Sequence, residues 1–380
     1  MTGWSLVCSA CEHGAPGDGL ASVCAACGQP YLVRFHAPPS SRGCLPNRWD
    51  MWRYAPLLPL RDGEEPVTLG EGATPLLELR SLAAGLGVRR LWVKDEGLNP
   101  TGSFKARGMS TAVTRARALG VPGLIVPTAG NAGAALAAYA AAAELPARVY
   151  APESTPIALL ETIRALGASL VTVPGHIGDA GKAARADAAS SGFFDMSTLR
   201  EPYRIEGKKT MGLELAEQLG WRLPDAIIYP TGGGTGLIGM WKAFAEIRAL
   251  GWLGGAASMP RMITAQSDGC APIVRAFAAG DDRAIPFEDP QTYASGLRVP
   301  APFGDRLILR ALRESGGDAE SASESEIRAA TTRLAHASGI DVSPEGGCAL
   351  AVCERLLDAN RLSRNAEIVI FNTGSGAGYR

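Results

Sequence analysis

The sequence lacks a charge excess of either sign. Lysine and arginine together number 37 and aspartate and glutamate together 38, so the formal net charge at pH 7 is -1. A protein that binds nucleic acid through its electrostatics needs a basic surface, and this composition supplies no surplus of positive charge for one. We therefore expect no nucleic-acid partner and a small, neutral or zwitterionic ligand.

Long apolar runs are also missing. The longest, the alanine-rich stretch 132–145, is well short of the roughly 20 residues that a bilayer span needs. The N-terminal residues MTGWSLVCSACEH do not have the layout of a signal peptide. We expect no membrane association and a cytoplasmic location.

No internal repeat of fixed period is present, and short β-branched runs alternate with helical patterns instead. The strand-like runs are RRLWVKD (89–95), GLIVPTA (123–129), ARVYAP (147–152), SLVTVP (169–174), DAIIYP (225–230), RMITAQS (261–267) and AEIVIFNTG (366–374). Helices are expected to begin at Ser103, Asn131 and Gly236. This alternation predicts an α/β fold with parallel sheets covered by helices on both faces. A length of 380 residues favours two domains and an accessory segment.

Two stretches rich in proline and polar residues are poor candidates for regular structure. Residues 34–70 are expected to form a lead-in arm instead of a packed unit. Residues 281–303 carry four prolines and predict a mobile loop over a site.

Cysteine is concentrated at the N-terminus. Four of the eight cysteines, Cys8, Cys11, Cys24 and Cys27, form two CxxC pairs. This spacing lets four thiolates reach one tetrahedral zinc ion. An empty reduced ribbon and two short-loop disulfides are the alternatives, and disulfides suit a secreted protein better. We predict a structural zinc in a ribbon-like segment, residues 1–40, with no open coordination position for chemistry.

The stretch LNPTGSFKARG (98–108) places Lys105 in the first turn of a predicted helix, which Ser103 is expected to cap. Helix N-termini carry partial positive charge, so a lysine there is disfavoured unless its charge is removed or used. A Schiff base with an aldehyde cofactor uses the amine covalently. The alternative is a solvated lysine whose flexible stem points outward.

The stretch PTGGGTGLIG (230–239) follows an apolar strand and opens a helix. Unobstructed backbone N–H groups at a helix N-terminus form a phosphate cradle. GTGLIG also fits the dinucleotide pattern GxGxxG, but the acidic residue that this pattern needs about 20 positions later is absent. The loop therefore favours a lone phosphate, and a glycine turn without a ligand is the alternative. The cradle residues are Gly232, Gly233, Gly234, Thr235 and Gly236.

Two further strand ends carry polar residues beside glycines. Asn131 opens an alanine-rich helix in PTAGNAGAALAAYA, and its amide can donate to a ring hydroxyl. Thr373 ends the last strand in FNTGSGAGY, where a hydroxyl can bond a pyridine nitrogen without protonating it. Each is a weak signal alone, since Asn at a helix start and Thr-Gly at a strand end are common.

Together these segments resemble the pyridoxal-phosphate enzymes of the tryptophan-synthase-β fold type and, within them, the threonine synthase family. The resemblance covers nearly the full length. It is carried by the CxxC ribbon, GEGATPL (70–76), KDEGLNPTGSFKARG (94–108), GNAGAALAAYA (130–140), PYRIEGKKT (202–210), the glycine loop and the final TGSG. It implies two doubly wound α/β domains: a large cofactor-binding domain (41–108 and 216–380) and a small domain (109–215).

The resemblance also implies roles for single residues. Lys105 is expected to form the Schiff base and then to move protons at the substrate's carbons. The loop 232–236 is expected to hold the cofactor phosphate, Asn131 to bond the ring hydroxyl and Thr373 to face the pyridine nitrogen. Ser103, Thr128 and Asn131 are expected near the substrate carboxylate, because their turns converge at strand ends. The implied reaction converts O-phospho-L-homoserine and water to L-threonine and phosphate, with Arg204 on the substrate phosphate.

Other functions stay open. The family pattern Asn-Ser-x-Asn-Pro-Tyr-Arg holds the substrate phosphate, and here the segment TLREPYR (198–204) keeps only Arg204 of its polar contacts. The tri-glycine loop is more like that of threonine and serine dehydratases, so a β-eliminating dehydratase with the same lysine and cofactor is one alternative. A nucleotide-binding regulatory protein built on GTGLIG is another. A homodimer is possible, as dimers are common in such folds.

Two smaller expectations concern charged residues. Arg200, Lys208 and Lys209 can join Arg204 in a rebuilt phosphate site, although a basic run of this kind is more often a solvated face. Glu345, in SPEGG, is expected to cap a helix, and a place in the lining of the site is the alternative.

Overall fold

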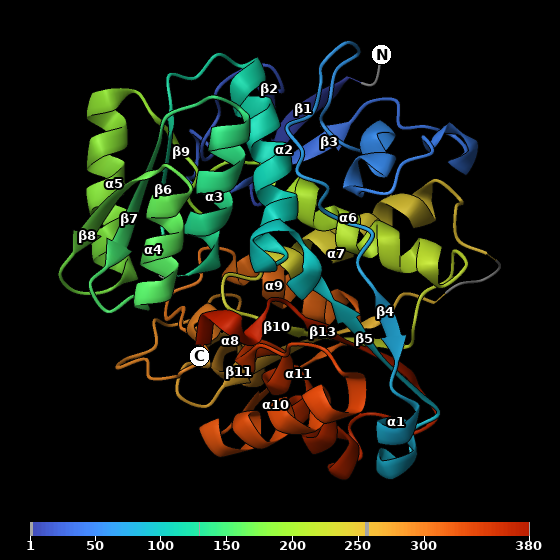
Figure 1. Ribbon diagram of the computed structural model, residues 1–380. Helices are drawn as coiled ribbons and strands as arrows, with labels where there is room; N and C mark the ends of the chain where they lie inside the picture. The colour runs from blue at the N-terminus through green and yellow to red at the C-terminus, as the bar shows by residue number, and fades with distance from the viewer. Residues whose placement is uncertain (1–2, 129, 255–257, 380) are drawn as a thin grey trace. The chain divides into compact units, whose positions relative to one another are not determined.

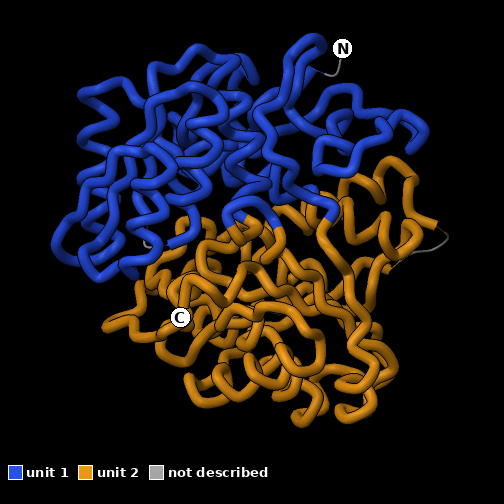
Figure 2. The backbone as a smooth tube through the Cα atoms, in the orientation of Figure 1, with its two compact units in different colours: residues 1–73, 99–101, 105–210 blue, residues 74–98, 102–104, 211–380 orange. Residues whose placement is uncertain are grey.

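The chain alternates between strands and helices along most of its length, as the computed structural model shows for residues 3–128, 130–254 and 258–379 (Figure 1). It divides into two compact units (Figure 2). Unit 1 comprises residues 1–73, 99–101 and 105–210, and unit 2 comprises residues 74–98, 102–104 and 211–380. None of the described helices combines the length and apolarity that crossing a membrane requires.

Unit 1 begins with a small antiparallel sheet in the order β2-β1-β3. Its strands are β1 (Trp4–Cys8), β2 (Gly14–Pro16) and β3 (Tyr31–Phe35). Alternate residues of β1, namely Trp4, Leu6 and Cys8, are buried, as the two-residue period of a half-covered strand requires. The loops around these strands carry the remaining CxxC cysteines, and this fits the predicted ribbon-like segment.

The second sheet of unit 1 is parallel, in the order β8-β7-β6-β9. Its strands are β6 (Leu124–Pro127), β7 (Ala147–Pro152), β8 (Ser169–Val173) and β9 (Phe194–Asp195). The associated helices are α2 (Lys105–Ala118), α3 (Asn131–Ala142), α4 (Ile157–Ala165), α5 (Ile177–Ser191) and the first half of α6 (Tyr203–Gln218). Alanines dominate the buried face of α3, so α2 and α3 can pack closely.

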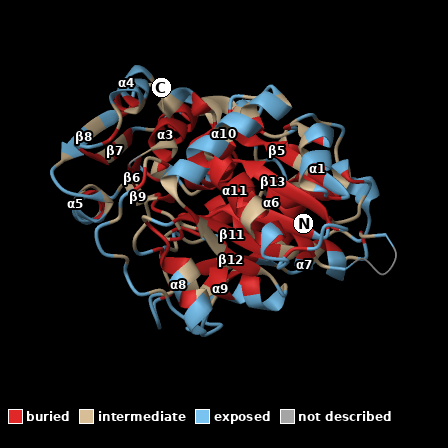
Figure 3. Cartoon of the chain, turned by 90° about the horizontal axis from the view of Figure 1, so that it is seen from below, coloured by how far each residue is buried: buried red, intermediate tan, exposed pale blue. Residues whose placement is uncertain are grey.

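Unit 2 contains one six-stranded sheet in the order β12-β11-β10-β13-β5-β4, parallel except for the edge strand β4. Its strands are β4 (Leu76–Glu78), β5 (Arg90–Asp95), β10 (Ala226–Pro230), β11 (Arg261–Ser267), β12 (Asp318–Ala322) and β13 (Glu367–Asn372). Every residue of β10 and β13 is buried, and Figure 3 shows β13 in red. Near-continuous apolar strands of this kind need cover on both faces.

Helices supply that cover in unit 2. They are α1 (Arg80–Leu86), the second half of α6, α7 (Thr235–Ala249), α8 (Pro272–Ala279), α9 (Asp305–Glu314), α10 (Glu324–Ser338) and α11 (Pro344–Asp358). In Figure 1, α7 and α9 lie above the strands and α10 and α11 below them. α11 packs on β10, β11, β12 and β13. The predicted α/β fold with mainly parallel sheets is therefore confirmed.

The stretch 34–70 is packed, so its prediction as a lead-in arm was wrong. It contains two 3-10 helices, η1 (Arg42–Cys44) and η2 (Met51–Leu57), and Met51 and Trp52 are buried. The Trp52 indole donates to Glu71 Oε1 at 3.1 Å and to Ser110 Oγ at 2.9 Å. Proline discourages regular structure in such a stretch, but it does not prevent burial.

Some boundaries differ from the expected ones. The helix that carries Lys105 begins at Lys105 itself, two residues after Ser103, because the preceding turn holds Thr101 and Gly102 at φ 60° and 69°. α3 begins at Asn131 as predicted, and α7 begins one residue before Gly236. Residues 281–303 contain only the short helix η5 (Ser295–Leu297), in line with the prediction of little regular structure.

The compact units divide the chain at places other than the predicted domains. The chain leaves unit 2 at residue 104 and re-enters it at residue 211, whereas the predicted small domain spans 109–215. Residues 41–73 group with unit 1, since Met51, Trp52 and Glu71 bond within it. Compactness does not define a functional domain, so the domain ranges stay a prediction.

Candidate active site

The four CxxC cysteines meet in unit 1. Their sulfur atoms all lie within 4.8 Å of one another. The Sγ atoms of Cys8 and Cys27 are 3.4 Å apart and those of Cys11 and Cys24 3.6 Å apart. A zinc–sulfur bond of about 2.3 Å in a tetrahedron gives sulfur–sulfur edges of about 3.8 Å, and these two pairs lie within about 0.4 Å of that value.

Polar residues of unit 2 gather where its central strands end. β5, β13 and β10 are adjacent and parallel, so their carboxyl ends share one edge of the sheet. β5 ends at Asp95, β13 at Asn372 next to Thr373, and β10 leads into the glycine loop. In open α/β sheets, ligands bind at this edge.

The glycine loop cannot carry side chains at three of its positions. An added Cβ would overlap Gly296 O at Gly232, the Ile308 side chain at Gly234 and the Tyr229 hydroxyl at Gly236. Gly234 also has φ 73°, a conformation that favours glycine. The N–H groups that precede and open α7 are thus left without covering side chains, which is what a phosphate cradle requires.

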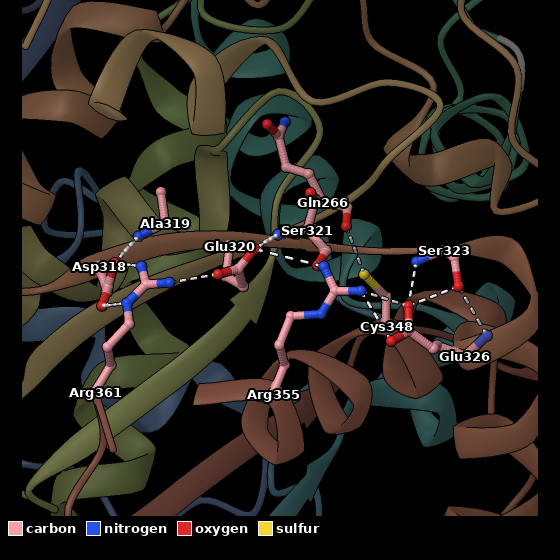
Figure 4. Close-up of polar contacts among 10 residues, drawn as sticks. All are labelled: Gln266, Asp318, Ala319, Glu320, Ser321, Ser323, Glu326, Cys348, Arg355 and Arg361. Carbon is pink, nitrogen blue, oxygen red and sulfur yellow. Dashed lines mark hydrogen bonds and ion pairs between the residues drawn. The ribbon is translucent and has the colours of Figure 1, made fainter. Parts of the chain in front are cut away.

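Gln266 supports the glycine loop from the neighbouring strand β11. Its amide Nε2 donates to Thr231 O at 2.9 Å, directly before Gly232. Its Oε1 accepts from Ile273 N at 3.0 Å and Val274 N at 3.2 Å, the first free donors of α8. The Cys348 thiol donates to the backbone oxygen of Gln266 at 3.2 Å, as Figure 4 shows. Gln266 was not predicted from the sequence, although an amide inside the apolar run RMITAQS is a signal of such a role.

Glu345 supports the same loop indirectly, so its prediction as a helix cap was wrong. Ser343 is the N-cap of α11. The Glu345 carboxylate instead accepts from Gly296 N at 2.8 Å and from the Tyr379 hydroxyl. Burial, and then the Glu345 charge, raise the pKa of Tyr379 well above its usual range. These bonds fix Gly296, the residue that lies against Gly232.

The residues just before Lys105 are bound to the end of β13. Phe104 N donates to Thr373 O at 3.1 Å, and Ser103 pairs with Gly374 in an isolated β-bridge. The Phe104 ring meets the Tyr229 ring edge-on, with centroids 6.0 Å apart. Lys105 follows at the first position of α2 and is half-buried. Its predicted place in the first turn of a helix is confirmed.

Thr128 and Asn131 lie around the start of α3 in unit 1. The Thr128 hydroxyl donates to Gly130 O at 3.1 Å and accepts from Gly130 N at 3.0 Å, forming a tight turn. Asn131 is half-buried at the first position of the helix. Since α2 and α3 pack together, the helices that begin at Lys105 and Asn131 are neighbours in this unit.

Arg204 is buried at the start of α6. Its guanidinium donates to Met196 O at 2.5 Å, and its Nε has no hydrogen-bond partner among the residues that the structure describes. Burial lowers the pKa of Arg204, and burial raises the pKa of the nearby Glu201 to about 7. A buried cation with an unused donor fits an anionic ligand.

The basic residues near Arg204 do not form a solvated face, so that expectation was wrong. Lys208 and Lys209 are both fully buried. Lys209 bonds Glu206 and Leu57 O, each at 2.6 Å. A buried lysine needs partners, and for Lys209 a buried carboxylate and a backbone oxygen supply them.

The predicted residues thus fall into two sets. Ser103, the loop 232–236 and Thr373 belong to unit 2, and Lys105, Thr128, Asn131 and Arg204 belong to unit 1. The glycine loop at the start of α7, in unit 2, fits a phosphate group. Lys105 at the N-terminus of α2, in unit 1, carries an amine that can bond an aldehyde. Each feature, taken in its own unit, suits one group of a phosphorylated aldehyde cofactor.

Comparisons with known proteins identify the family. Residues 67–374 match the family described as pyridoxal-phosphate dependent enzyme. The chain is 39% identical to a threonine synthase of Methanosarcina acetivorans over 85% of this chain and 79% of that protein. It is 37% identical to a threonine synthase of Methanocaldococcus jannaschii over 86% of this chain and 80% of that protein.

A solved structure extends the comparison. A threonine deaminase from T.th. superimposes with a TM-score of 0.63 at 29% identity, covering 80% of this chain and 92% of the other. The tryptophan-synthase-β-like fold is therefore confirmed. The fold carries a glycine-rich loop at a helix start and a lysine at the start of another helix. With the family match over most of the sequence, the chain belongs to the family of pyridoxal-phosphate dependent enzymes.

Proposed function

We propose that the protein is a pyridoxal-phosphate-dependent lyase that converts O-phospho-L-homoserine and water to L-threonine and phosphate. The observation that carries this proposal is the 39% identity to a threonine synthase across 85% of the chain. The predicted lysine at the start of α2 and the glycine cradle at the start of α7 support it.

The cofactor, when bound, supplies an electron sink for carbanion chemistry at the substrate. The backbone N–H groups of the loop 232–236 would hold its phosphate, Asn131 would donate to its ring hydroxyl, and the Thr373 hydroxyl would face its ring nitrogen. Lys105 would bond its aldehyde carbon. Because a threonine hydroxyl is not acidic, Thr373 would leave that nitrogen unprotonated.

The chain's own residues then perform binding and proton transfer. The Lys105 amine removes the α-proton of the substrate and moves protons between its α and β carbons. Ser103 and Thr128 bind the substrate carboxylate, and Arg204 binds the phosphate that leaves the γ carbon. The γ carbon takes up a proton and becomes the methyl group, and water adds at the β carbon, which gives threonine.

A structural zinc in the Cys8, Cys11, Cys24 and Cys27 cluster is part of this proposal. Four protein thiolates leave no open position, so the ion would brace the ribbon and take no part in the reaction. Metal analysis of protein purified without chelator should find zinc near one equivalent. Protein without bound metal would contradict it.

A threonine dehydratase is the second candidate, because the tri-glycine loop and the superposition on a threonine deaminase favour it. Incubation with L-threonine tests it directly. Formation of a 2-keto acid and ammonia, without phosphate release from O-phosphohomoserine, would move the assignment to the dehydratase. The nucleotide-binding regulatory protein is set aside, since the chain belongs to a cofactor-dependent enzyme family.

We also propose a cytoplasmic location, a small amino-acid substrate and a homodimer. Light scattering of the purified enzyme tests the dimer. A mass near 79 kDa, twice the 39.6 kDa of one chain, is the expected result.

A further inference from the structure

We propose that the cysteine ribbon, residues 1–40, is a positioning element for the segment 198–204 and thereby for Arg204. This inference rests on the proposed function, because it takes Arg204 as the group that binds the substrate phosphate. It assigns the ribbon a part in substrate affinity in addition to stability.

Two hydrogen bonds join the ribbon to this segment within unit 1. Ser22 Oγ donates to Arg200 O at 2.6 Å. The Tyr203 hydroxyl donates to Gly17 O at 3.1 Å. The bonded residues are 178 and 186 positions apart in the sequence, so these are tertiary contacts and not local turns.

The ribbon side of these contacts lies near the cysteine cluster and is fixed by packing. Ser22 lies two residues before Cys24, one of the four cysteines. A Cβ on Gly17 would come within 2.5 Å of the Trp4 ring, so the Gly17 backbone is pressed against that ring. Arg115 of α2 lies over the same ring at 5.0 Å and over the Tyr203 ring at 5.9 Å. The stack of Trp4, Arg115 and Tyr203 therefore holds the two sides together.

The segment on the other side needs external support. Leu199 has φ 61°, a left-handed conformation that a leucine adopts only where its surroundings hold it. The next residue, Arg200, is the one whose oxygen Ser22 binds. The Glu201 carboxylate accepts from Tyr203 N at 2.7 Å and from Arg204 N at 3.0 Å, so it starts α6.

Arg204 follows directly from these anchored residues. Its neighbour Tyr203 is fully buried and is the residue bound to Gly17. A shift of the segment would change the direction of the guanidinium, whose Nε has no hydrogen-bond partner in the described part of the chain. Displacements of about 1 Å are enough to weaken binding and catalysis markedly.

The test removes the two ribbon contacts one at a time in the cofactor-loaded full-length enzyme. Ser22 is exposed, so Ser22→Ala should not disturb folding, and Tyr203→Phe removes only the buried hydroxyl. Ser190→Ala and Tyr150→Phe are the matched controls in the same unit. The Ser190 hydroxyl donates to Asp187 O at 3.1 Å and the Tyr150 hydroxyl to Asp187 Oδ2 at 3.0 Å.

Two readouts separate positioning from stability. One hydrogen bond corresponds to about a fivefold change in an equilibrium constant, so each ribbon variant should raise KM for O-phosphohomoserine about fivefold. Its kcat should stay within about twofold and its cofactor absorbance should stay unchanged. Hydrogen exchange of the peptide 198–204 should speed up about fivefold in both variants and in neither control.

The outcomes distinguish this inference from the proposed function. If hydrogen exchange of residues 198–204 is unchanged in both variants, the ribbon does not position this segment and the inference is overturned. If exchange is faster but KM is unchanged, the ribbon only stabilises the segment, and the inference is also overturned. If Arg204→Gln has the same KM for O-phosphohomoserine as the wild type and still makes threonine, Arg204 does not bind the substrate. That result overturns this inference and leaves the proposed function standing. If the wild-type enzyme makes no threonine, the proposed function fails by itself, and hydrogen exchange still decides the coupling.

Discussion

At the scale of single residues, the glycine loop shows how backbone space is reserved for a ligand. Gly234 combines a left-handed conformation, φ 73°, with the Ile308 side chain in the place of its missing Cβ. Gly280, the C-cap of α8, has φ 77° and open space around its Cβ position. The two positions share the backbone conformation and differ in crowding.

This difference predicts unequal effects of alanine. Gly280→Ala should lower the free energy of unfolding by about 1 kcal/mol, the usual cost of a left-handed alanine. Gly234→Ala should cost about 2–4 kcal/mol through strain and overpacking, and it should weaken cofactor binding at least tenfold by moving the cradle. Urea unfolding and cofactor titration measure both, and equal effects of the two substitutions would argue against the crowding at Gly234.

A buried carboxylate gives a second prediction at this scale. Glu71 is fully buried and accepts from the Tyr139 hydroxyl of α3 at 2.5 Å, from the Trp52 indole and from Leu69 N. Tyr139→Phe should lower the free energy of unfolding by about 1–3 kcal/mol, because one donor to a buried charge is lost. Tyr150→Phe, at a half-buried hydroxyl, should cost less than about 1 kcal/mol. A smaller loss for Tyr139→Phe than for Tyr150→Phe would contradict the role given to Glu71.

At the scale of elements, α10 and α11 are joined by a charged network at the edge strand β12 (Figure 4). Glu326 completes a capping box with Ser323 at the start of α10 and accepts from Arg355 of α11 at 2.6 Å. Arg361, after α11, bonds the carboxylates of Asp318 and Glu320 of β12. Arg355 lowers the pKa of Glu326 to about 2, with help from Ser323.

The direction of this shift sets a pH dependence. A lowered carboxyl pKa stabilises the fold above the ordinary value of 4.5, and that stabilisation is lost as the pH falls towards about 2. Glu326→Gln should therefore cost about 1 kcal/mol at pH 7, since the pair is partly exposed, and almost nothing near pH 2. Urea unfolding of both proteins across this range measures the effect. An equal cost at both ends of the range would show that charge plays no part.

At the scale of the whole molecule, the ribbon combines a cysteine cluster with packing on unit 1, because Trp4, Leu6 and Tyr31 are buried in one apolar cluster with residues of α2 and α3. Its three strands contain only 13 residues, since β1, β2 and β3 have five, three and five. Sheets this small depend on a metal or on neighbouring elements for stability. The contacts of the ribbon with Arg115, Arg200 and Tyr203 provide support from neighbouring elements.

Replacing one of the four cysteines tests whether a metal ion stabilises the ribbon. Cys11→Ser should reduce bound zinc from near one equivalent to less than about 0.2, and it should lower the midpoint of thermal unfolding by several degrees. Cys44→Ser, at an exposed cysteine outside the cluster, should change neither. Full zinc content in Cys11→Ser would remove this cysteine from the site.

Much of this architecture could be predicted from local sequence. The apolar runs of β5, β10 and β13, the helix starts at Asn131 and near Lys105, and the glycine cradle are encoded in short stretches. Contacts between stretches that are distant in the sequence could not be predicted, because no local pattern indicates them. The burial of Lys209 beside Glu206, the support of Gly296 by Glu345 and the support of Thr231 by Gln266 all depend on tertiary packing. The edge strands β4 and β12 were missed because short edge strands lack a long apolar run.

The most direct test of the central claim is phosphate release from O-phosphohomoserine by the purified, cofactor-loaded enzyme, with the amino-acid product identified. Phosphate and L-threonine in equal amounts are the predicted result. Lys105→Ala should lose the absorbance of the lysine-bound cofactor and lower kcat by at least about a thousandfold. A wild-type enzyme that shows this absorbance but releases no phosphate, and that makes a 2-keto acid from threonine, would contradict the assignment.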